Sequence, residues 1–531
     1  MAARPARAGR KEKPGRHSGR NDWLRLFRLS EIPTSPHDPA DVQVNATSAT
    51  QRESAPAALL ARMENVPFSW WHTKARVIMG SATFFDAYNA LSLAFALPIL
   101  NRLWHMSPKQ SGALISASYV GQLIGALWFG WLAERSGRVR SATWAVALMS
   151  VMNVVCIFAG SFQTMLAYRL VQGIGVGGEM PVAAAYISEL SSAKGRGRFF
   201  LLYEMIFPIG LMATGQLGAW IVPLWGWQSM FLVGAIPGLL ITPLIARLPE
   251  SPRWLIAKNR MADAERVVAE LEASTPRRFG RAEASAPSVD LGAPISRLAG
   301  FGQSSAEAAG SPGSASDAHS LRDRVPSGHW RELLSSFYRE RTLIAWALWA
   351  CAYFIANSLN NWMPSLYTSV YHLGLKQALR AASLTNVAQV AILIVCAFCI
   401  DFVGRRDWTI ASFLLGGALL AILGLTRAPS VTRVMILGTL SYGIIGSINA
   451  VLYLYTPEIY PTRLRAAGTG LATSWLRLAS AVGPALVGVL VATRGGVNSV
   501  FLMFVGVGVL GAIAASRMIE TRNRRLEELA P

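Results

Sequence analysis

Twelve apolar stretches dominate this chain, and each is long enough to cross a bilayer as a helix, which takes about 20 residues. Lipid offers no hydrogen bonds to backbone N–H and C=O groups, so a stretch that lies in lipid must be helical. Only 15% of the 531 residues are charged, whereas soluble domains carry about 25%. The sequence therefore predicts an all-α membrane protein with twelve transmembrane helices. The stretches lie at roughly 77–100, 110–133, 141–160, 163–187, 199–222, 228–247, 342–365, 378–400, 408–427, 432–455, 466–493 and 497–517.

The apolar stretches form two groups of six, which polar segments flank and separate. We expect residues 1–75 to be a disordered basic tail that ends in an interfacial segment. An N-terminal six-helix bundle is predicted at 76–247 and a C-terminal one at 341–517. The stretch between them, 248–340, is rich in Ala, Ser and Gly and predicts a largely disordered linker. Residues 518–531 are predicted to be a C-terminal tail.

The net charge of +20 lies in the N-terminal tail and in alternate loops. The loops after the second, fourth, eighth and tenth stretches are basic, whereas the loops on the opposite side carry few Lys or Arg residues. Positive loops stay in the cytoplasm. This pattern places both termini and the linker in the cytoplasm and the chain in the inner membrane. It also explains the positive charge without a nucleic-acid partner.

The two halves carry the same landmarks at offsets of 267 to 270 residues. Parallel repeats of this kind place a substrate site between the halves, near the membrane midplane, and work by alternating access. The sequence therefore predicts a secondary transporter. The matching pairs, first half before second, are Gly137 and Gly404, Glu189 and Glu458, Arg196 and Arg465, and Glu250 and Glu520.

The motifs at these landmarks resemble those of the major facilitator superfamily. GWLAERSGRVR (130–140) resembles the family's loop signature after the second helix, although Glu134 replaces the usual Asp and Val139 a basic residue. PESPRWL (249–255) is similar to the mark after the sixth helix in sugar-porter-like members. RLVQGIGVGGEMPVAAAYISE (169–189) and YTPEIYPTRLRAAGTG (455–470) look closest to nicotinate transporters and synaptic-vesicle-protein-like relatives. The resemblance implies two six-helix bundles and transport of a small metabolite.

The resemblance also implies that charged residues at the cytoplasmic helix ends lock the outward-facing state. Acid–Arg pairs there can bridge neighbouring helices. The alternative is that these are solvated loop charges that serve only topology. Glu179 and Glu204, in the cytoplasmic thirds of the fourth and fifth stretches, are expected to pair with them. The predicted gating residues are Glu134, Arg135, Gly137, Arg138, Glu179, Glu189, Arg196, Glu204, Glu250, Arg253, Asp401, Gly404, Arg405, Glu458 and Arg465.

Asp86 lies nine residues into the first stretch, roughly 13 Å deep at 1.5 Å per residue. An ionised side chain at such depth is costly and marks a functional candidate. We expect Asp86 to be the proton-coupling carboxylate, with Arg169 as its counter-ion; the alternative is a structural salt bridge. Nicotinate-type and aromatic-acid-type relatives tend to have a second Asp where this chain has Asn89. Either Asp86 couples alone, or the protein is an uncoupled facilitator.

Arg477, eleven residues into the eleventh stretch, is the best candidate for binding an anionic substrate, because a guanidinium binds a carboxylate in two places. Helix bridging is an equal alternative for this residue. Uncharged polar and aromatic residues are expected to complete the pocket, although each is also a candidate for packing between helices. They are Tyr88, Asn89, Gln122, Asn357, Asn361, Trp362, Gln389, Asn449, Tyr453 and Trp475.

No residue pattern supports an enzyme or an ATP-driven pump. The chain has no G-x-x-x-x-G-K-[ST] phosphate loop and no H-E-x-x-H motif. Its four cysteines lie in apolar stretches without nearby histidines, so no metal or cofactor is expected. Gly173, Gly175 and Gly178 spell G-x-G-x-x-G, but no strand precedes them, and close helix packing is the better interpretation.

We therefore expect a monomeric transporter in the lipid bilayer that moves a small organic carboxylate, such as nicotinate or an aromatic acid, together with protons. The alternative within the same superfamily is a sugar or polyol porter or an uncoupled facilitator, which PESPRWL and Asn89 favour. A receptor or scaffold built on a transporter fold is a third interpretation. The motifs that repeat in both halves argue against it.

Overall fold

The computed structural model describes residues 56, 58–63, 66, 69–190, 205–274, 330–426, 430–493 and 495–522. Within these residues twelve helices have 19 residues or more, six in each half of the chain. The first six are α2 (Trp70–Leu103), α3 (Pro108–Ser136), α4 (Arg138–Ile157), α5 (Phe162–Leu190), α7 (Ile206–Trp225) and α8 (Gln228–Ala246). The second six are α12 (Arg339–Ser369), α13 (Leu375–Val403), α14 (Arg405–Leu425), α15 (Val431–Glu458), α16 (Thr462–Val491) and α17 (Gly496–Ser516).

Each predicted apolar stretch falls on one of these helices. In the described part of the chain, eleven of them are long and apolar enough to cross a membrane. The remaining long helix, α5, carries Arg169, Gln172 and Glu179 in its central part. Its length of 29 residues is still sufficient to span a bilayer. The predicted fold class, an all-α membrane protein of two six-helix bundles, is confirmed.

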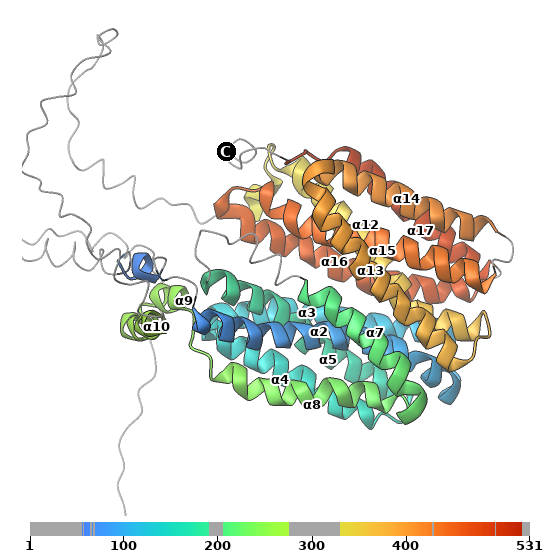
Figure 1. Ribbon diagram of the computed structural model, residues 1–531, viewed down its shortest axis with the longest axis horizontal. Coiled ribbons are helices and arrows are strands. Elements are labelled where there is room, and N and C mark those ends of the chain that lie inside the picture. The colour runs from blue at the N-terminus through green and yellow to red at the C-terminus, as the bar shows by residue number, and fades with distance from the viewer. Residues whose placement is uncertain are drawn as a thin grey trace, which may run out of the picture. The chain divides into compact units, whose positions relative to one another are not determined.

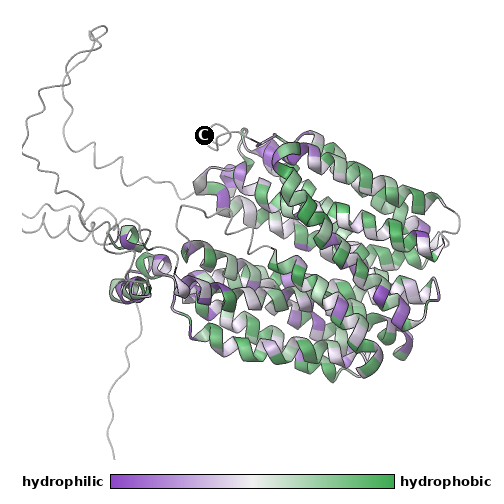
Figure 2. Ribbon diagram, in the orientation of Figure 1, coloured by the Kyte–Doolittle hydropathy of each residue, from purple (hydrophilic) through white to green (hydrophobic). Residues whose placement is uncertain are grey.

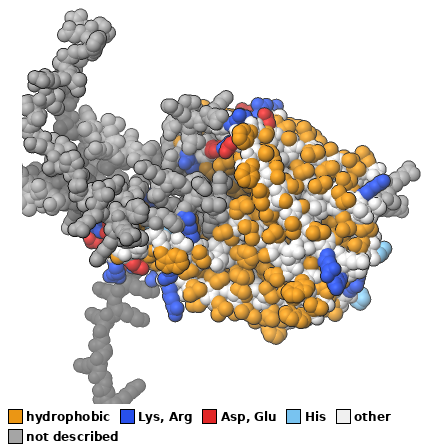
Figure 3. Space-filling view, in the orientation of Figure 1, with side chains coloured by type: hydrophobic (Ala, Val, Ile, Leu, Met, Phe, Trp, Pro, Cys, Tyr) orange, Lys and Arg blue, Asp and Glu red, His pale blue; other side chains and the backbone are white. Residues whose placement is uncertain are grey.

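The two bundles lie beside each other with their helices roughly parallel (Figure 1), and α3 of the first packs against α16 of the second. Hydrophobic residues predominate along the helices (Figure 2). Apolar side chains cover most of the flank in Figure 3, while Lys, Arg, Asp and Glu gather near its ends. Large apolar side chains are exposed in the middle of several helices, such as Leu240 of α8, Leu415 of α14 and Leu510 of α17. Such a surface suits contact with lipid, which offers no hydrogen-bond partners.

Glycines let α3 and α5 approach backbone to backbone in the first bundle. A Cβ atom added at Gly173 would lie 2.1 Å from the carbonyl oxygen of Ser118 on α3. One added at Gly175 would lie 2.6 Å from the backbone nitrogen of Met149 on α4. Small residues permit such close contacts between membrane helices. The prediction that the G-x-G-x-x-G motif serves helix packing is therefore confirmed.

The two bundles meet most closely at one end. We call the end that carries the α3–α4 and α13–α14 loops the basic side, and the other end the opposite side. On the opposite side, a Cβ atom at Gly112 of α3 would lie 2.6 Å from the carbonyl oxygen of Pro484 on α16. A Cβ atom at Gly488 would lie 2.4 Å from the carbonyl oxygen of Pro108. The bundles are therefore in backbone contact at this end.

On the basic side, the PESPRWL segment satisfies the ends of three helices. Glu250 Oε1 accepts hydrogen bonds from the backbone N–H groups of Arg138 (2.9 Å) and Val139 (3.2 Å), which begin α4. Trp254 Nε1 donates to the last-turn carbonyl of Glu134 on α3 at 3.1 Å. Arg253 Nε donates to the carbonyl of Glu189 near the end of α5, also at 3.1 Å. Since helix ends leave backbone groups unpaired, this segment joins α3, α4 and α5.

The second half repeats part of this arrangement. Glu520 Oε1 accepts a hydrogen bond from the backbone N–H of Arg405 at 3.1 Å, and Oε2 accepts one from Arg406 at 3.0 Å. Gly137 and Gly404, which precede the capped helices, have φ values of 109° and 99°. Side chains rarely adopt this backbone conformation, so glycine is the residue that fits both turns.

Two parts of the polar segments prove to be helical. In the predicted linker, Pro252–Ala257 forms α9 and Met261–Ala273 forms α10, while residues 275–329 lie outside the described part. In the predicted tail, residues 58–63 are helical and α2 begins at Trp70 rather than near residue 77. Leu59 and Met63 join the apolar core that includes Val267 and Leu271 of α10. Buried apolar surface explains why these short segments are ordered.

Replacing Gly137 or Gly404 with Ala is expected to destabilise the protein. The new Cβ atom would lie 2.2 Å from Glu250 Oε2 in the first variant and 2.6 Å from Glu520 Oε2 in the second. The disfavoured φ adds about 1–3 kcal/mol. Thermal unfolding of purified protein in detergent measures the loss. Gly130→Ala is the control, because nothing lies within 4 Å of its added Cβ; an equal loss in the control would contradict the explanation.

Candidate substrate-binding cavity

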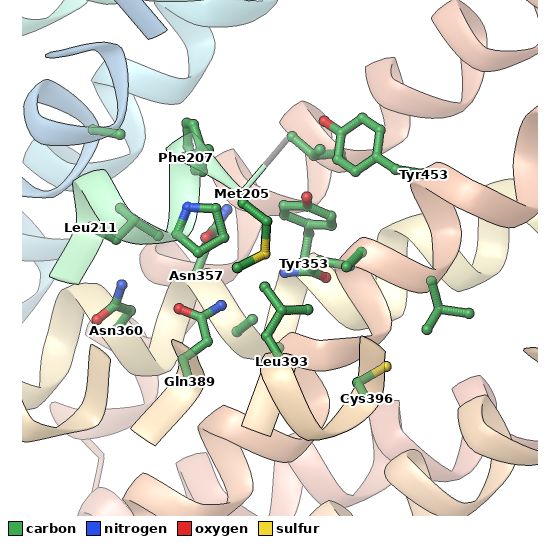
Figure 4. Close-up of a pocket in the computed structure, with 18 of the residues that line it drawn as sticks. Met205, Phe207, Leu211, Tyr353, Asn357, Asn360, Gln389, Leu393, Cys396 and Tyr453 are labelled. Carbon is green, nitrogen blue, oxygen red and sulfur yellow. The ribbon is translucent and has the colours of Figure 1, made fainter. Parts of the chain in front are cut away.

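A cavity of about 690 Å³ lies between the two bundles. Nine helices line it: α2, α3, α5 and α7 from the first half, and α12, α13, α14, α15 and α16 from the second. Figure 4 shows Phe207 and Leu211 of α7 on one side, with Tyr353 and Asn357 of α12 and Gln389 of α13 around the same space. The charged and polar residues that line its inner part are Asp86, Tyr119, Gln122, Tyr353, Asn357, Asn360, Asn361, Gln389, Tyr442, Asn449, Tyr453 and Arg477.

The cavity reaches the basic side but is closed on the opposite side. Its lining extends to Asp401 and Arg405, at the α13–α14 loop. At the closed end, Asn361 Nδ2 of α12 donates a hydrogen bond to the Tyr119 hydroxyl of α3 at 2.9 Å. Beyond this bond the α3 and α16 glycines bring the bundles together.

Asp86 on α2 and Arg477 on α16 face this cavity from opposite bundles. Their exposed fractions are 4% and 8%. Asp86 Oδ1 accepts no hydrogen bond from the described residues, and Arg477 Nε donates none to them. The one bond that the described residues provide for Arg477 runs from Nη1 to the carbonyl of Thr473, at 3.3 Å. The two groups act on each other electrostatically, and among the described residues they form no direct ion pair.

In the inner part of the cavity wall, two further polar atoms lack a partner among the described residues, Gln122 Nε2 of α3 and Asn449 Oδ1 of α15. Buried polar groups are nearly always hydrogen-bonded, and each exception calls for an explanation. Unpaired donors and acceptors from both bundles converge on one cavity here. A polar ligand or water would satisfy them.

Arg169 does not pair with Asp86, so the expectation that it is the Asp86 counter-ion is wrong for this conformation. Its Nη1 donates to Gln172 Oε1, one turn further along α5, and to the carbonyl of Asn89 at 3.5 Å. Gln172 Nε2 donates to Asn153 Oδ1, and Asn153 Nδ2 donates to Asn89 Oδ1 at 2.8 Å. This buried network joins α2, α4 and α5 within the first bundle. Arg169 and Asn89 therefore lie beside the cavity rather than in its wall.

Glu179 lies deep in α5 rather than in the charged region at the basic end. It is ten residues before Glu189, roughly 15 Å along a helix. Thr83 Oγ1 of α2 donates to Glu179 Oε1 at 3.0 Å. Thr83 is three residues before Asp86 and shares its helix face. The expectation that Glu179 belongs to the gating charges is corrected accordingly.

The cavity includes seven of the predicted substrate-binding residues and leaves out four. Gln122, Asn357, Asn361, Gln389, Asn449, Tyr453 and Arg477 line it. Tyr88 instead contacts Met230, and Asn89 belongs to the Arg169 network. Trp362 donates to the carbonyl of Pro484, and Trp475 lies against Trp346. These four side chains point between helices or outward. The direction of a side chain could not be predicted from the sequence here, because a helix that is apolar on every face shows no periodicity that marks one face as buried.

Four polar residues in the inner part of the cavity were not predicted: Tyr119, Tyr353, Asn360 and Tyr442. Tyr353 is four residues before Asn357, which is four before Asn361, so the i, i+4 spacing extends one turn beyond the predicted pair. This spacing was a usable signal. No sequence signal marks Tyr119 and Tyr442 as cavity residues, because a tyrosine in an apolar helix is equally suited to packing between helices.

Two charged clusters lie at the basic side, one in each bundle. In the first, Arg138 of α4 pairs with Glu134 of α3 at 2.8 Å and with Glu189 of α5 at 3.0 Å. The Arg138 and Glu189 side chains are 10% and 19% exposed. This cluster therefore bridges three neighbouring helices, which solvated loop charges would not do.

The second cluster repeats the first. Arg405 of α14 pairs with Asp401 of α13 at 3.0 Å and with Glu458 of α15 at 3.6 Å. Each cluster is confined to its own bundle among the described residues, so neither holds the bundles together at this side. Arg196 and Glu204 lie outside the described residues.

Two other predicted gating residues make different contacts. Arg135 lies with its guanidinium 5.4 Å from the ring centre of Trp131, one turn away on α3. Arg465, near the start of α16, has a buried Nε without a hydrogen-bond partner among the described residues. Neither joins the two clusters by a described ion pair.

Two bundles of six membrane helices that close around a polar cavity define a membrane transporter fold. The chain belongs to the major facilitator superfamily: residues 79–399 match the family model described as Major Facilitator Superfamily. Residues 302–531 match the model described as Sugar (and other) transporter. As a member of this superfamily, the chain is a transporter of small metabolites.

Known proteins resemble the chain along most of its length. The niacin transporter NiaP of Acinetobacter baylyi is 29% identical over 477 residues, which cover 89% of this chain and 99% of that protein. The gallate transporter of Pseudomonas putida is 26% identical over 427 residues, covering 80% and 85%. A partially occluded inward-open structure of the xylose transporter XylE from E. coli has a TM-score of 0.64 at 18% identity, covering 86% and 100%.

Glu250 and Glu520 are expected to affect the pH dependence of stability in opposite directions. Burial raises the pKa of Glu250, despite hydrogen bonds from Ser251, Val139 and Arg138 N–H groups. Burial acts on Glu520 in the same sense, but hydrogen bonds from backbone N–H groups outweigh it and lower its pKa. A carboxyl group whose pKa is lower in the folded state stabilises the protein at pH values above its pKa in the unfolded state. This stability is lost as the pH falls through its pKa in the folded state. A carboxyl group whose pKa is higher in the folded state stabilises the protein at pH values below its pKa in the unfolded state. This stability is lost as the pH rises through its pKa in the folded state.

Thermal unfolding of Glu250→Gln and Glu520→Gln from acid to neutral pH measures this difference. Glu520→Gln should be less stable than wild type near neutral pH, and this difference in stability should become smaller in acid. The pH-dependent difference between Glu250→Gln and wild type should have the opposite slope. Two variants with the same slope would show that the two capping carboxylates do not differ as described.

Proposed function

We propose that this protein carries small organic carboxylates across the bacterial inner membrane together with protons. The observation that carries the proposal is the placement of Asp86 and Arg477 on opposite bundles, facing one buried cavity without a direct ion pair. A guanidinium is a strong partner for a carboxylate. A buried carboxylate without a hydrogen-bond donor is a suitable site for a transported proton.

The cavity wall suits a compact ring that carries a carboxylate. Apolar side chains, among them Met180, Phe207 and Leu211, provide surface for a ring. Gln122 and Asn449 supply unpaired polar atoms at its edge. Nicotinate or an aromatic acid fits this combination, and the niacin and gallate transporters among the relatives support the choice. One chain contains the whole cavity, so a monomer suffices.

Alternating access follows from the two halves rocking about the cavity. The positive-inside rule makes the basic side cytoplasmic, together with both termini, so this conformation faces the cytoplasm. Opening to the other side requires the Tyr119–Asn361 bond and the α3–α16 contact to part. The charged clusters around Arg138 and Arg405 are the gating groups that would then meet across the cytoplasmic side.

A sugar or polyol porter is the second candidate. Asn357, Asn360 and Asn361 of α12 place three amides in the cavity wall, and amides bind hydroxyl groups well. Asn89 cannot titrate, which suits an uncoupled facilitator. Arg477, which forms no direct ion pair with a described residue, favours the carboxylate, because a neutral polyol could not form an ion pair with its guanidinium.

Asp86→Asn should abolish accumulation of the substrate but retain exchange. The amide keeps the size of the side chain and cannot carry a proton. The assay is uptake of radiolabelled nicotinate and benzoate into proteoliposomes under an imposed proton gradient, with and without a protonophore, compared with counterflow. The control is Glu270→Gln, an exposed carboxylate on α10. Undiminished accumulation by Asp86→Asn would remove Asp86 from coupling.

Arg477→Gln should weaken carboxylate binding about tenfold or more, because a hydrogen bond to a charged group contributes about 1.5–3 kcal/mol. Binding of nicotinate, benzoate and xylose to the purified protein, followed by thermal shift, measures the effect. Arg380→Gln, an exposed arginine on α13, is the matched control. Xylose binding that exceeds carboxylate binding in wild type, and survives in Arg477→Gln, would favour the polyol porter.

A further inference from the structure

A second carboxylate lies beside the proposed proton site. Glu179 of α5 is fully buried, and Thr83 Oγ1 of α2 donates to its Oε1 at 3.0 Å. Thr83 is one helical turn before Asp86, and residues three apart share a helix face. The hydroxyl therefore holds Glu179 against the part of α2 that presents Asp86. Asp86 Oδ1 accepts no hydrogen bond from the described residues and faces the cavity.

The charged groups that act on Asp86 are Glu179 from α5 and Arg477 from α16. Arg169 is on the same helix as Glu179, but its guanidinium is bound to Gln172 and to a backbone carbonyl of α2. From the other helices, the Tyr119 hydroxyl of α3 is bound to Asn361 of α12. The Asp86 carboxyl group is therefore subject to one positive charge, that of Arg477, and to one further carboxyl group, that of Glu179.

We infer that Asp86 and Glu179 form a proton-sharing carboxyl pair, and that Glu179 is a second coupling residue. This inference rests on the proposed transport of a carboxylate with protons. Two carboxylates close together in a water-poor site cannot both remain ionised, so one of them keeps a proton. The other, ionised carboxylate balances Arg477. The pair titrates as a unit, and a proton belongs to the pair rather than to one residue.

Charge balance then links the proton to the substrate. When a substrate carboxylate binds Arg477, it brings a second negative charge into the buried site. A proton from the side to which the cavity is open adds to the remaining carboxylate oxygen and forms an O–H bond. The loaded site holds Arg477 and the substrate as an ion pair, with both Asp86 and Glu179 protonated. Release reverses these steps and delivers one proton with each monocarboxylate.

This pair also explains how the site works with Asn89. Asn89 lies one turn after Asp86 and cannot titrate, so α2 itself supplies a single acid. Glu179 reaches the same region from α5 and supplies another. The second acid therefore comes from a helix that packs against α2.

Infrared difference spectra of the purified full-length protein, recorded without substrate between acid and alkaline pH, test the pair directly. Wild type should show a protonated carboxyl band at neutral pH. Asp86→Asn and Glu179→Gln should each lose this band, because the remaining carboxyl group then ionises opposite Arg477. A neutral-pH band that is lost in only one of the two variants, or in neither, would overturn the inference. This readout does not depend on the identity of the substrate.

Transport gives the second readout, with radiolabelled nicotinate as the probe in proteoliposomes. Glu179→Gln should keep nicotinate counterflow but lose proton-driven accumulation and nicotinate-induced proton uptake. Glu270→Gln should behave as wild type. Wild-type accumulation by Glu179→Gln, together with its loss in Asp86→Asn, would overturn the role of Glu179. If wild type carries neither nicotinate nor benzoate, the proposed function fails, and the infrared result still decides whether the pair exists.

Thr83→Val provides a test if Glu179→Gln does not fold. It keeps both carboxyl groups and removes the hydroxyl that positions Glu179. The pH midpoint of the infrared band should shift, while the variant elutes as a folded monomer. An unchanged midpoint in a folded Thr83→Val protein would show that the contact does not tune the pair and would overturn the inference.

Discussion

Hydrocarbon cannot solvate a charge, and this constraint governs where every ionisable side chain in the helices lies. Asp86, Arg169, Glu179 and Arg477 are each less than 10% exposed. Nη1 of Arg169 donates to neutral oxygens inside the first bundle. Asp86 and Arg477 line the cavity between the bundles, and Glu179 lies against Thr83 of α2. The cost of an uncompensated charge thus places the polar chemistry where two bundles meet and away from lipid.

The same requirement, that polar groups be paired, builds rigid units at the basic side. A glutamate caps the helix that follows Gly137 and the helix that follows Gly404, and an arginine on each of these helices pairs with acids of both neighbouring helices. Trp254 and Arg253 add bonds to the ends of α3 and α5. Each bundle is thereby tied together by its own charged cluster. A transporter whose halves rock against each other needs two rigid bundles around one cavity, and the charged clusters make each bundle rigid at this side.

Several features of the site were predictable from residues, and others were not. An acid at the depth of Asp86 and an arginine at the depth of Arg477 are expensive in lipid, so their presence alone pointed to an interior site. The spacing of Asn357 and Asn361 likewise identified one face of α12. The hydrogen-bond partners of these buried polar residues could not be predicted in this way. The pairing of Arg169 with Gln172, and the position of Glu179 beside Thr83, depend on how α2, α4 and α5 are rotated about their axes.

The sequence by itself determined the helices, the division into two repeated halves and the family, because apolar length and motif spacing are properties of the chain. Tertiary structure decided which polar groups share the cavity and which bind one another inside a bundle. It turned Trp362 and Trp475 away from the cavity and brought Tyr119 to its closed end. The physical reason is that membrane helices are apolar on nearly all faces, so their rotation is set by close packing of small residues and by a few buried hydrogen bonds.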